Sequence, residues 1–184
     1  DDVEADGVTI RKGRLWTFTV VDHIIVDDFE NYTNSSPNRV FQAWVDGIGF
    51  SIDSFFPNGH EGNGTGSAAG HDIWSAGTTY TDIMETGITH DGSEQSMPLY
   101  YGLDGKPTSE VERTFTSPED WTVHGVTTLV VHFHGVAGNA PAPLYLKING
   151  VNVSYRDGAP STAIPLWKPW SIDLASVGTN LKSV

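Results

Sequence analysis

The sequence predicts an all-β fold, an antiparallel β-sandwich in a single domain, and three observations support it. The segment TTLVVHFHG (127–135) alternates apolar and polar residues, as a half-buried strand does, and LYLKING (144–150) repeats the pattern. No window shows sustained helical periodicity. The chain has 184 residues, which suits one domain with a core that needs no cross-links.

The first part of the chain divides into an acidic end, strands and a long loop. We expect residues 1–7 to be flexible and residues 8–184 to form the domain, with 8–26 as an N-terminal strand extension. Within that extension the strands fall near 8–11 and 14–26. The segment RVFQAWVDG (39–47) fits a further strand. FFPNGHEGNGTGSAAGHD (55–72) is so dense in Gly and Asn that it predicts a long loop.

The second part of the chain reads as a series of strands. Three short ones are expected in TDIMETGITHDG (81–92), QSMPLYYGL (95–103) and SEVERTFTS (109–117), separated by the turns HDGS and DGKP. In the strongest strand, Leu129, Val131 and Phe133 should face the core. In LYLKING the inward residues should be Leu144, Leu146 and Ile148. In the late strand WSIDL (170–174), Trp170 shares the phase of Ile172 and Leu174 and should also pack inside.

Composition excludes several classes of function. The chain has no cysteine, so disulfides and thiol chemistry are excluded. Its net charge of −13 repels phosphate backbones and anionic membrane surfaces, so nucleic acid is a poor partner. No apolar run approaches the roughly 18 residues that cross a bilayer, and DDVEADG lacks the features of a signal peptide. We therefore expect a soluble mature product without membrane insertion.

The order of several motifs resembles that of a known group of domains, and it covers the chain from about residue 24 onward. The motifs are VDDFENY (26–32), GNGTGSAAGHD (62–72), HDGSEQSMPLYY (90–101), SEVERTF (109–115), DWTVHGVTTLVVHFHG (120–135), LYLKING (144–150) and WKPWSIDL (167–174). Together they resemble secreted bacterial, planctomycete-like jelly-roll domains of the galactose-binding-like type, the architecture of many carbohydrate-binding modules. The resemblance implies a secreted or cell-surface location and a carbohydrate ligand.

The end of the chain raises three alternatives. In the domains that it resembles, a segment like GTNLKSV (178–184) leads into one or two further strands. Residues 8–26 would supply the last strand, or one sheet edge is open, or the chain is a fragment of a longer protein. An open edge accepts a strand from a neighbour and would support a homo-oligomer.

An acidic group at the two ends of the predicted sandwich suggests a structural calcium ion. Carboxylates brought together from the first and last strands repel one another unless a hard cation neutralises them. Of Asp27, Asp28, Glu30 and Asp173, we expect Asp28, Glu30 and Asp173 to be the ligands, and the resemblance implies calcium in this region. The competing interpretation is that these carboxylates are solvated or cap turns.

Aromatic and polar side chains form the candidate sugar site. Pyranose rings stack on flat aromatic side chains, while their hydroxyls need polar partners. His132 and His134 project from one strand face about 7 Å apart, which also suits a metal pair or an ordinary solvated face. Arg113 shares the phase of Val111 and Phe115, so it must be paired, bulged outward or held at a ligand surface. The predicted carbohydrate-binding residues are Trp74, Tyr80, Tyr100, Arg113, His132, His134, Tyr145 and Lys147.

A catalytic role has little support in the sequence. Glu110 and Glu112 lie two residues apart on an expected strand, a spacing that glycosidases use, but nothing around them suggests burial of either carboxyl group. We therefore expect a non-catalytic extracellular polysaccharide-binding module of a surface or polysaccharide-degrading protein. The alternative is a structural subunit of an extracellular assembly, in which one chain's N-terminal segment completes its neighbour's sheet by strand exchange.

Overall fold

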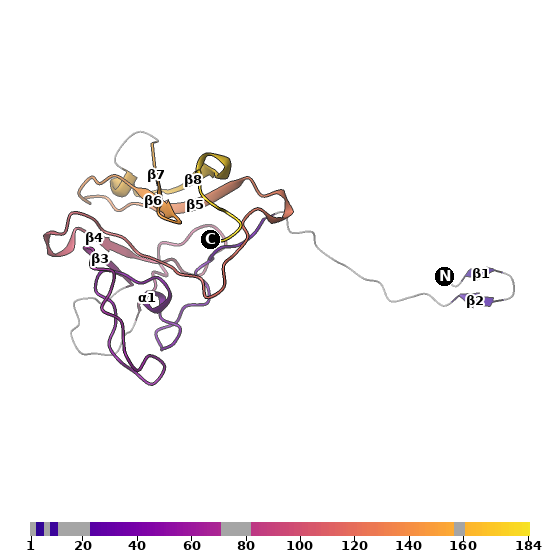
Figure 1. The fold of residues 1–184 in the computed structure, drawn as a ribbon, viewed down its shortest axis with the longest axis horizontal. Helices are drawn as coiled ribbons and strands as arrows, with labels where there is room; N and C mark the ends of the chain where they lie inside the picture. The colour runs from indigo at the N-terminus through magenta and orange to yellow at the C-terminus, as the bar shows by residue number, and fades with distance from the viewer. Residues whose placement is uncertain (1–2, 6–7, 11–22, 71–81, 157–160) are drawn as a thin grey trace.

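The computed structural model describes residues 3–5, 8–10, 23–70, 82–156 and 161–184 (Figure 1). In these residues the regular structure is mostly strand, arranged in small antiparallel sheets of two strands each. Helix is limited to one α-helical turn and four 3-10 turns. The expected all-β class is therefore confirmed.

Eight strands form four antiparallel pairs. They are β1 (Val3–Ala5) with β2 (Val8–Ile10), β3 (Ser67–Ala69) with β4 (Leu99–Tyr101), β5 (Thr128–His134) with β8 (Trp167–Asp173), and β6 (Tyr145–Ile148) with β7 (Val151–Ser154). The helical elements are α1 (Val40–Ala43) and the 3-10 turns η1 (Leu103–Gly105), η2 (Val123–Gly125), η3 (Ser161–Ala163) and η4 (Leu174–Ser176).

The β5–β8 pair is the longest and builds the larger apolar cluster. In its register, Leu129 lies opposite Ile172 and Val131 lies opposite Trp170. Leu129, Val131 and Phe133 pack against this cluster, and Trp170, Ile172 and Leu174 are buried in it. The inward phase expected for both strands is confirmed, because alternate side chains of a strand point to one face.

The β6–β7 hairpin adds to the same cluster. Asn149 and Gly150 join its strands and both have positive φ, 47° and 79°, as a two-residue type I′ turn requires. Leu144, Leu146 and Ile148 contact the cluster, as expected from the alternation in LYLKING. Strand β7 was not predicted, although Asn-Gly followed by VNVS is a hairpin signal.

A second apolar cluster surrounds α1 and corrects one prediction. Residues 39–47 were expected to form a strand, but Val40–Ala43 is a single helical turn and Val45 alone makes a bridge, to Glu112. The neighbours Val40 and Phe41 are both buried, which differs from the alternating exposure of a half-buried strand. The side-chain oxygen of Gln42 accepts the Arg39 backbone N–H at 3.2 Å and so caps the turn locally.

The remaining predicted strands are shorter than expected. In 81–92 and 95–103 the pairing consists of a Glu85–Ser96 bridge and the three residues of β4, and in 109–117 it is the bridge at Glu112. Residues 23–26 are not strand, and residues 14–22 lie outside the described part of the chain. Within the segment 1–7, expected to be flexible, Val3–Ala5 pairs with β2.

The segment 55–72 was expected to be a loop, but it contains the strand β3, which a buried carboxylate joins to an earlier turn. Asp46 is 2% exposed and accepts the backbone N–H groups of Ile48, Gly49 and Ala69 at 2.9, 2.7 and 2.8 Å. Burial raises the pKa of Asp46, and these hydrogen bonds oppose the rise. Gly49 has φ +73°, and a Cβ there would collide with the His60 carbonyl oxygen. Asp46 therefore fixes the turn at Ile48 and Gly49 against β3.

Candidate functional site

Four flat rings gather at one end of the β5–β8 pair, and we call them the ring cluster: His90, His132, His134 and Trp167. The two histidines of β5 share one strand face, and Trp167 lies directly opposite His134 in the register. The ring centroids of His90 and His132 are 4.0 Å apart. The Trp167 ring lies 5.5 Å from His90, edge to face, and 5.5 Å from His134.

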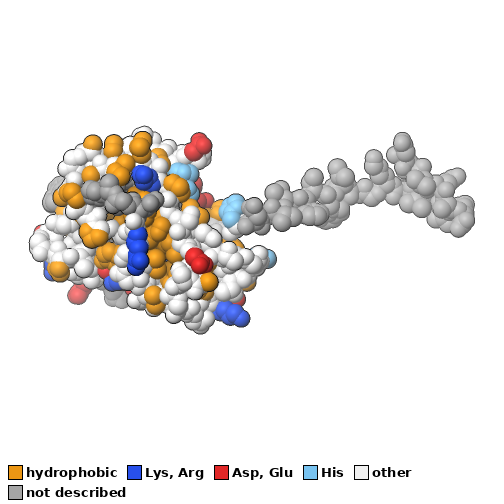
Figure 2. Space-filling model, turned by 90° about the horizontal axis from the view of Figure 1, so that it is seen from above, with side chains coloured by type: hydrophobic (Ala, Val, Ile, Leu, Met, Phe, Trp, Pro, Cys, Tyr) orange, Lys and Arg blue, Asp and Glu red, His pale blue; other side chains and the backbone are white. Residues whose placement is uncertain are grey.

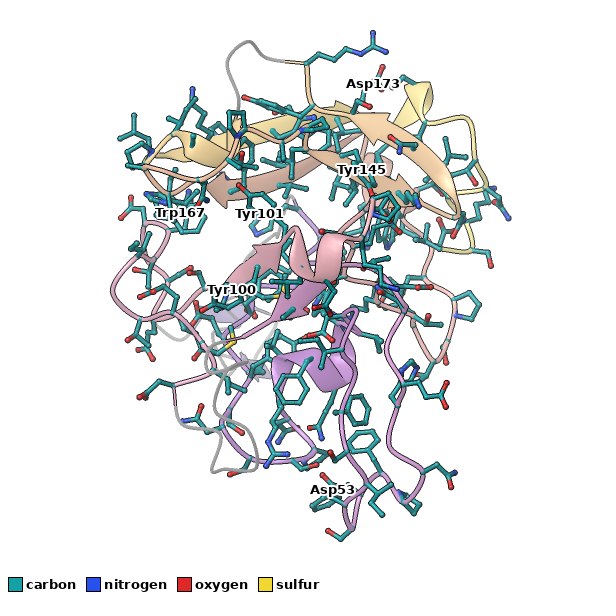
Figure 3. The ribbon with its side chains drawn as sticks, turned by 90° about the vertical axis from the view of Figure 1, so that its left-hand side faces the viewer. Asp53, Tyr100, Tyr101, Tyr145, Trp167 and Asp173 are labelled. Carbon is teal, nitrogen blue, oxygen red and sulfur yellow. The ribbon has the colours of Figure 1, made fainter. Side chains whose placement is uncertain are left out.

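The ring cluster combines two strands and a loop. The pairing of β5 with β8 holds three of the rings, and the turn that carries His90 adds the fourth from a different segment. Figure 3 shows Trp167 at one side of the layer formed by β5 and β8. Beside it along the chain, Leu166 is 63% exposed. The cluster therefore offers ring faces, imidazole nitrogens and apolar surface in one place.

The protonation of His132 follows from its surroundings. Partial burial lowers the pKa of His132, and the neighbouring His90 lowers it further. Near pH 7 the His132 imidazole is therefore neutral, and one ring nitrogen donates while the other accepts. A neutral ring of this kind suits hydroxyl groups, which also donate and accept.

Two further predicted sugar-binding residues are engaged by a glutamate. The phenolic O–H of Tyr145 and the ammonium of Lys147 each approach Oε1 of Glu110 at 2.5 Å. These two contacts hold the pKa of the Glu110 carboxyl below its ordinary value, while burial, helped by Glu110, raises the pKa of Tyr145 to about 12. Both side chains project from β6 as expected, but they serve an internal contact.

Arg113 is also paired within the protein. Its guanidinium forms an ion pair with Asp27 and lies over the Phe115 ring, 4.9 Å from the centroid. The same Asp27 carboxylate accepts the Tyr32 O–H at 2.7 Å and the Trp44 indole N–H at 2.8 Å. The sequence left Arg113 paired, bulged outward or held at a ligand surface, and the structure shows that it is paired.

The three predicted calcium ligands have separate local partners. Asp28 accepts the Glu30 backbone N–H at 3.1 Å, Glu30 accepts that of Glu94 at 3.2 Å, and Asp173 accepts that of Ala175 at 3.0 Å. Among the described residues, no three His, Asp or Glu side chains form a group placed to hold a metal ion. Calcium at Asp28, Glu30 and Asp173 therefore stays a prediction.

The other predicted ligand residues are aromatic. Tyr100 is half-buried on β4, whereas its neighbour Leu99 is 39% exposed. Trp74 and Tyr80 lie outside the described residues. The following residue, Tyr101, donates its O–H to the Ala140 carbonyl oxygen at 2.7 Å. Figure 3 shows Tyr100 and Tyr101 on the strand below the β5–β8 layer.

The sequence pointed to His132 and His134; Trp167 was one of several candidate aromatic residues but was not among the predicted ligands, and His90 was not a candidate. His90 was assigned to a turn, and Trp167 precedes the late strand as it was predicted. Only the register of β5 with β8 brings Trp167 beside His134. The HDG turn that follows His90 signals a loop but gives no indication of what the loop touches.

No helix in the described part of the chain has the length and apolar character needed to cross a bilayer. Comparison of the chain with protein-family models, with curated proteins and with solved structures gives no match.

Proposed function

We propose that this chain is a non-catalytic extracellular module that binds a polysaccharide on the ring cluster. The observation that carries the proposal is the ring cluster itself, in which successive ring contacts of 4.0 to 5.5 Å connect residues from paired strands and a separate loop. Sugar rings present apolar C–H faces that stack on flat side chains. Imidazole nitrogens at the same place supply donors and acceptors for hydroxyl groups.

The state of Glu110 supports a binding role over a catalytic one. A glycosidase needs one carboxylic acid whose pKa is raised, so that it can protonate the leaving group. Lys147 and Tyr145 lower the pKa of Glu110 instead. Glu112 is exposed, and its backbone makes the bridge to Val45.

The finer fold, the family and the location belong to the same proposal. The motif order from VDDFENY to WKPWSIDL motivates a two-sheet sandwich of the galactose-binding-like jelly-roll type, secreted by a bacterium. The proposal also includes a structural calcium ion held by Asp28, Glu30 and Asp173. It would stiffen loops and take no part in ligand chemistry.

A glycan array run with and without a chelator tests ligand class and ion dependence together. The wild-type chain should bind one class of polysaccharide, and Trp167→Ala should weaken that binding by about tenfold or more. Phe55→Ala is a matched control, because Phe55 is an aromatic side chain that is 60% exposed and lies outside the ring cluster. It should bind as the wild type does.

Two outcomes would contradict the proposal. One is the absence of any bound glycan, and the other is full binding by a Trp167→Ala variant whose circular dichroism matches the wild type. If the chelator changes neither binding nor melting temperature, the calcium prediction fails while the sugar proposal stands.

A further inference from the structure

An open groove of about 810 Å³ lies between β7 and β8. It is lined along the length of both strands, by residues 151–156 on one side and 169–173 on the other, with Ser176 and Val177 at one end. Each strand is paired on one side only: β7 pairs with β6, and β8 pairs with β5. The groove therefore lies between two strand edges that have no strand partner among the described residues.

The pairing register shows which backbone groups point into this groove. Tyr155 donates its N–H to the Leu144 carbonyl and Leu174 donates to that of Thr127, both at 2.9 Å. In an antiparallel pair, alternate residues bond to the partner strand and those between them point to the opposite edge. Backbone groups of Asn152 and Ser154 on β7, and of Ser171 on β8, therefore point away from their partners, toward the groove.

The chain contains a segment whose pattern fits such a groove. In residues 15–21, LWTFTVV, the apolar residues Trp16, Phe18 and Val20 alternate with Thr17 and Thr19. In an extended strand Trp16, Phe18 and Val20 share one apolar face, and the other face carries Thr17 and Thr19 between Leu15 and Val21. The groove likewise has buried Trp170 and Ile172 on its inner side and exposed Ser154 and Ser171 on its outer side. The segment has seven residues, as β8 does.

Two observations indicate that the segment comes from a second copy. Among the described strands, β1 and β2 of the hairpin that precedes it pair only with each other, and Figure 1 shows this hairpin apart from the body of the molecule. Arg11, Lys12 and Arg14 give the approach to the segment a positive charge, whereas the chain as a whole carries −13. Opposite charges favour encounter between copies. Figure 2, viewed from the side of β7 and β8, shows exposed hydrophobic side chains on this face.

We propose that residues 15–21 of one copy bind as an extended strand in the groove between β7 and β8 of a second copy. Each copy then offers one strand and one groove, so the contact is heterologous and grows head to tail unless a ring closes. The chain is thereby a structural subunit of an extracellular assembly. This inference does not depend on the ring cluster or on any sugar.

Sedimentation of the full chain over a range of concentrations tests the proposal, with variants matched in charge. The wild type should associate as concentration rises. Trp16→Asp with Phe18→Asp places two charges on the apolar face of the inserted strand and should leave a monomer. Thr17→Asp with Thr19→Asp places the same charges on the outer face and should associate within about twofold of the wild type.

A change in the groove provides the reciprocal test. Ser154→Pro removes an N–H that points into the groove while leaving the β6 pairing intact, because proline is tolerated at a strand edge. This variant should be monomeric with an unchanged circular dichroism spectrum. A fluorescent peptide of residues 13–22 should bind the Trp16→Asp, Phe18→Asp variant at least about tenfold more tightly than it binds Ser154→Pro.

Three results would overturn the inference. A wild-type chain that stays monomeric at every concentration shows that no second copy enters the groove. Association that survives Trp16→Asp with Phe18→Asp shows that another surface is responsible. Equal peptide binding by the two variants, each folded, shows that the groove is not the site.

Discussion

Tyr145 on β6 donates its phenolic O–H to Glu110 at 2.5 Å, across 35 residues of sequence. Glu110 also accepts through its backbone oxygen, from the side chains of Asn63 at 2.8 Å and Ser67 at 2.5 Å. Its neighbour Val111 packs against the apolar cluster around α1, whereas β6 belongs to the cluster of β5 and β8. Glu110 therefore joins the two clusters by polar contacts.

Removing the Tyr145 hydroxyl should destabilise this junction. Tyr145→Phe loses a hydrogen bond to a charged acceptor, and we expect the free energy of unfolding to fall by about 1.5 kcal/mol in urea titrations. Tyr101→Phe is the matched control, because the hydroxyl of Tyr101 donates to a neutral carbonyl oxygen. The free energy of unfolding should fall less in Tyr101→Phe than in Tyr145→Phe. An equal or larger fall in Tyr101→Phe would contradict the assigned role of Glu110.

The lowered pKa of Glu110 predicts a direction for the pH dependence of stability. A carboxyl whose pKa is lower in the folded state stabilises the fold above its ordinary value of 4.5, and this contribution is lost as the pH falls through the lowered value. Glu110→Gln has no carboxyl group at this position, so its free energy of unfolding should fall less on acidification than that of the wild type. Urea titrations at a series of pH values measure it, and identical pH profiles for the two proteins would disprove the assignment.

Breaking the ion pair of Arg113 with Asp27 should lower the free energy of unfolding more than breaking an exposed ion pair does. Asp27 keeps only 10% of its side chain exposed, so Arg113→Met leaves a largely buried carboxylate without its cation. We expect a loss of about 3 kcal/mol. Adding Asp27→Asn to Arg113→Met should recover part of that loss, because the stranded charge is removed. Strictly additive losses in this double-mutant cycle would show that the two groups do not interact.

Acid should weaken ligand binding on the ring cluster. Because burial lowers the pKa of His132 below 6.5, its ring stays neutral at pH 7 and is protonated only at lower pH. Above 6.5 the ring is neutral in both the folded and the unfolded state, so the shift does not affect the stability of the fold there; below 6.5 the unfolded state binds the proton more readily, and the free energy of unfolding falls as the pH falls. For a glycan found on the array, the affinity should be constant from pH 8 to 6.5 and should then decline. His132→Gln should decline less over the same range.

The sequence predicted the long regular elements and missed the short local ones. In β5, Leu129, Val131 and Phe133 alternate with Val130, His132 and His134 through a strand of seven residues, which is long enough to predict both the type of element and its phase. The helical turn α1 spans four residues, which is too short for a periodic signal. Its stability comes from burial of Val40 and Phe41, so tertiary packing overrides the apparent strand pattern.

The candidate site could be predicted only in part, because pairing partners are distant in sequence. The phase of Arg113 required a partner, yet nothing in the segment 109–117 identified Asp27 as that partner. Tyr145 and Lys147 were correctly placed on the outer face of their strand, but Glu110 comes from an earlier segment and engages both. The position of His90 against His132 likewise depends on how a turn folds back.

The division of the apolar side chains into two clusters has a consequence for how the molecule opens. We expect the amide protons around the Trp170 and Ile172 cluster and those around the Val40 and Ile83 cluster to belong to different cooperative units. Each unit can exchange with solvent on its own timescale, and a protease would cut the less protected one first. The Glu110 carboxylate, which joins the two clusters, would then determine how strongly the opening of one unit is coupled to the opening of the other.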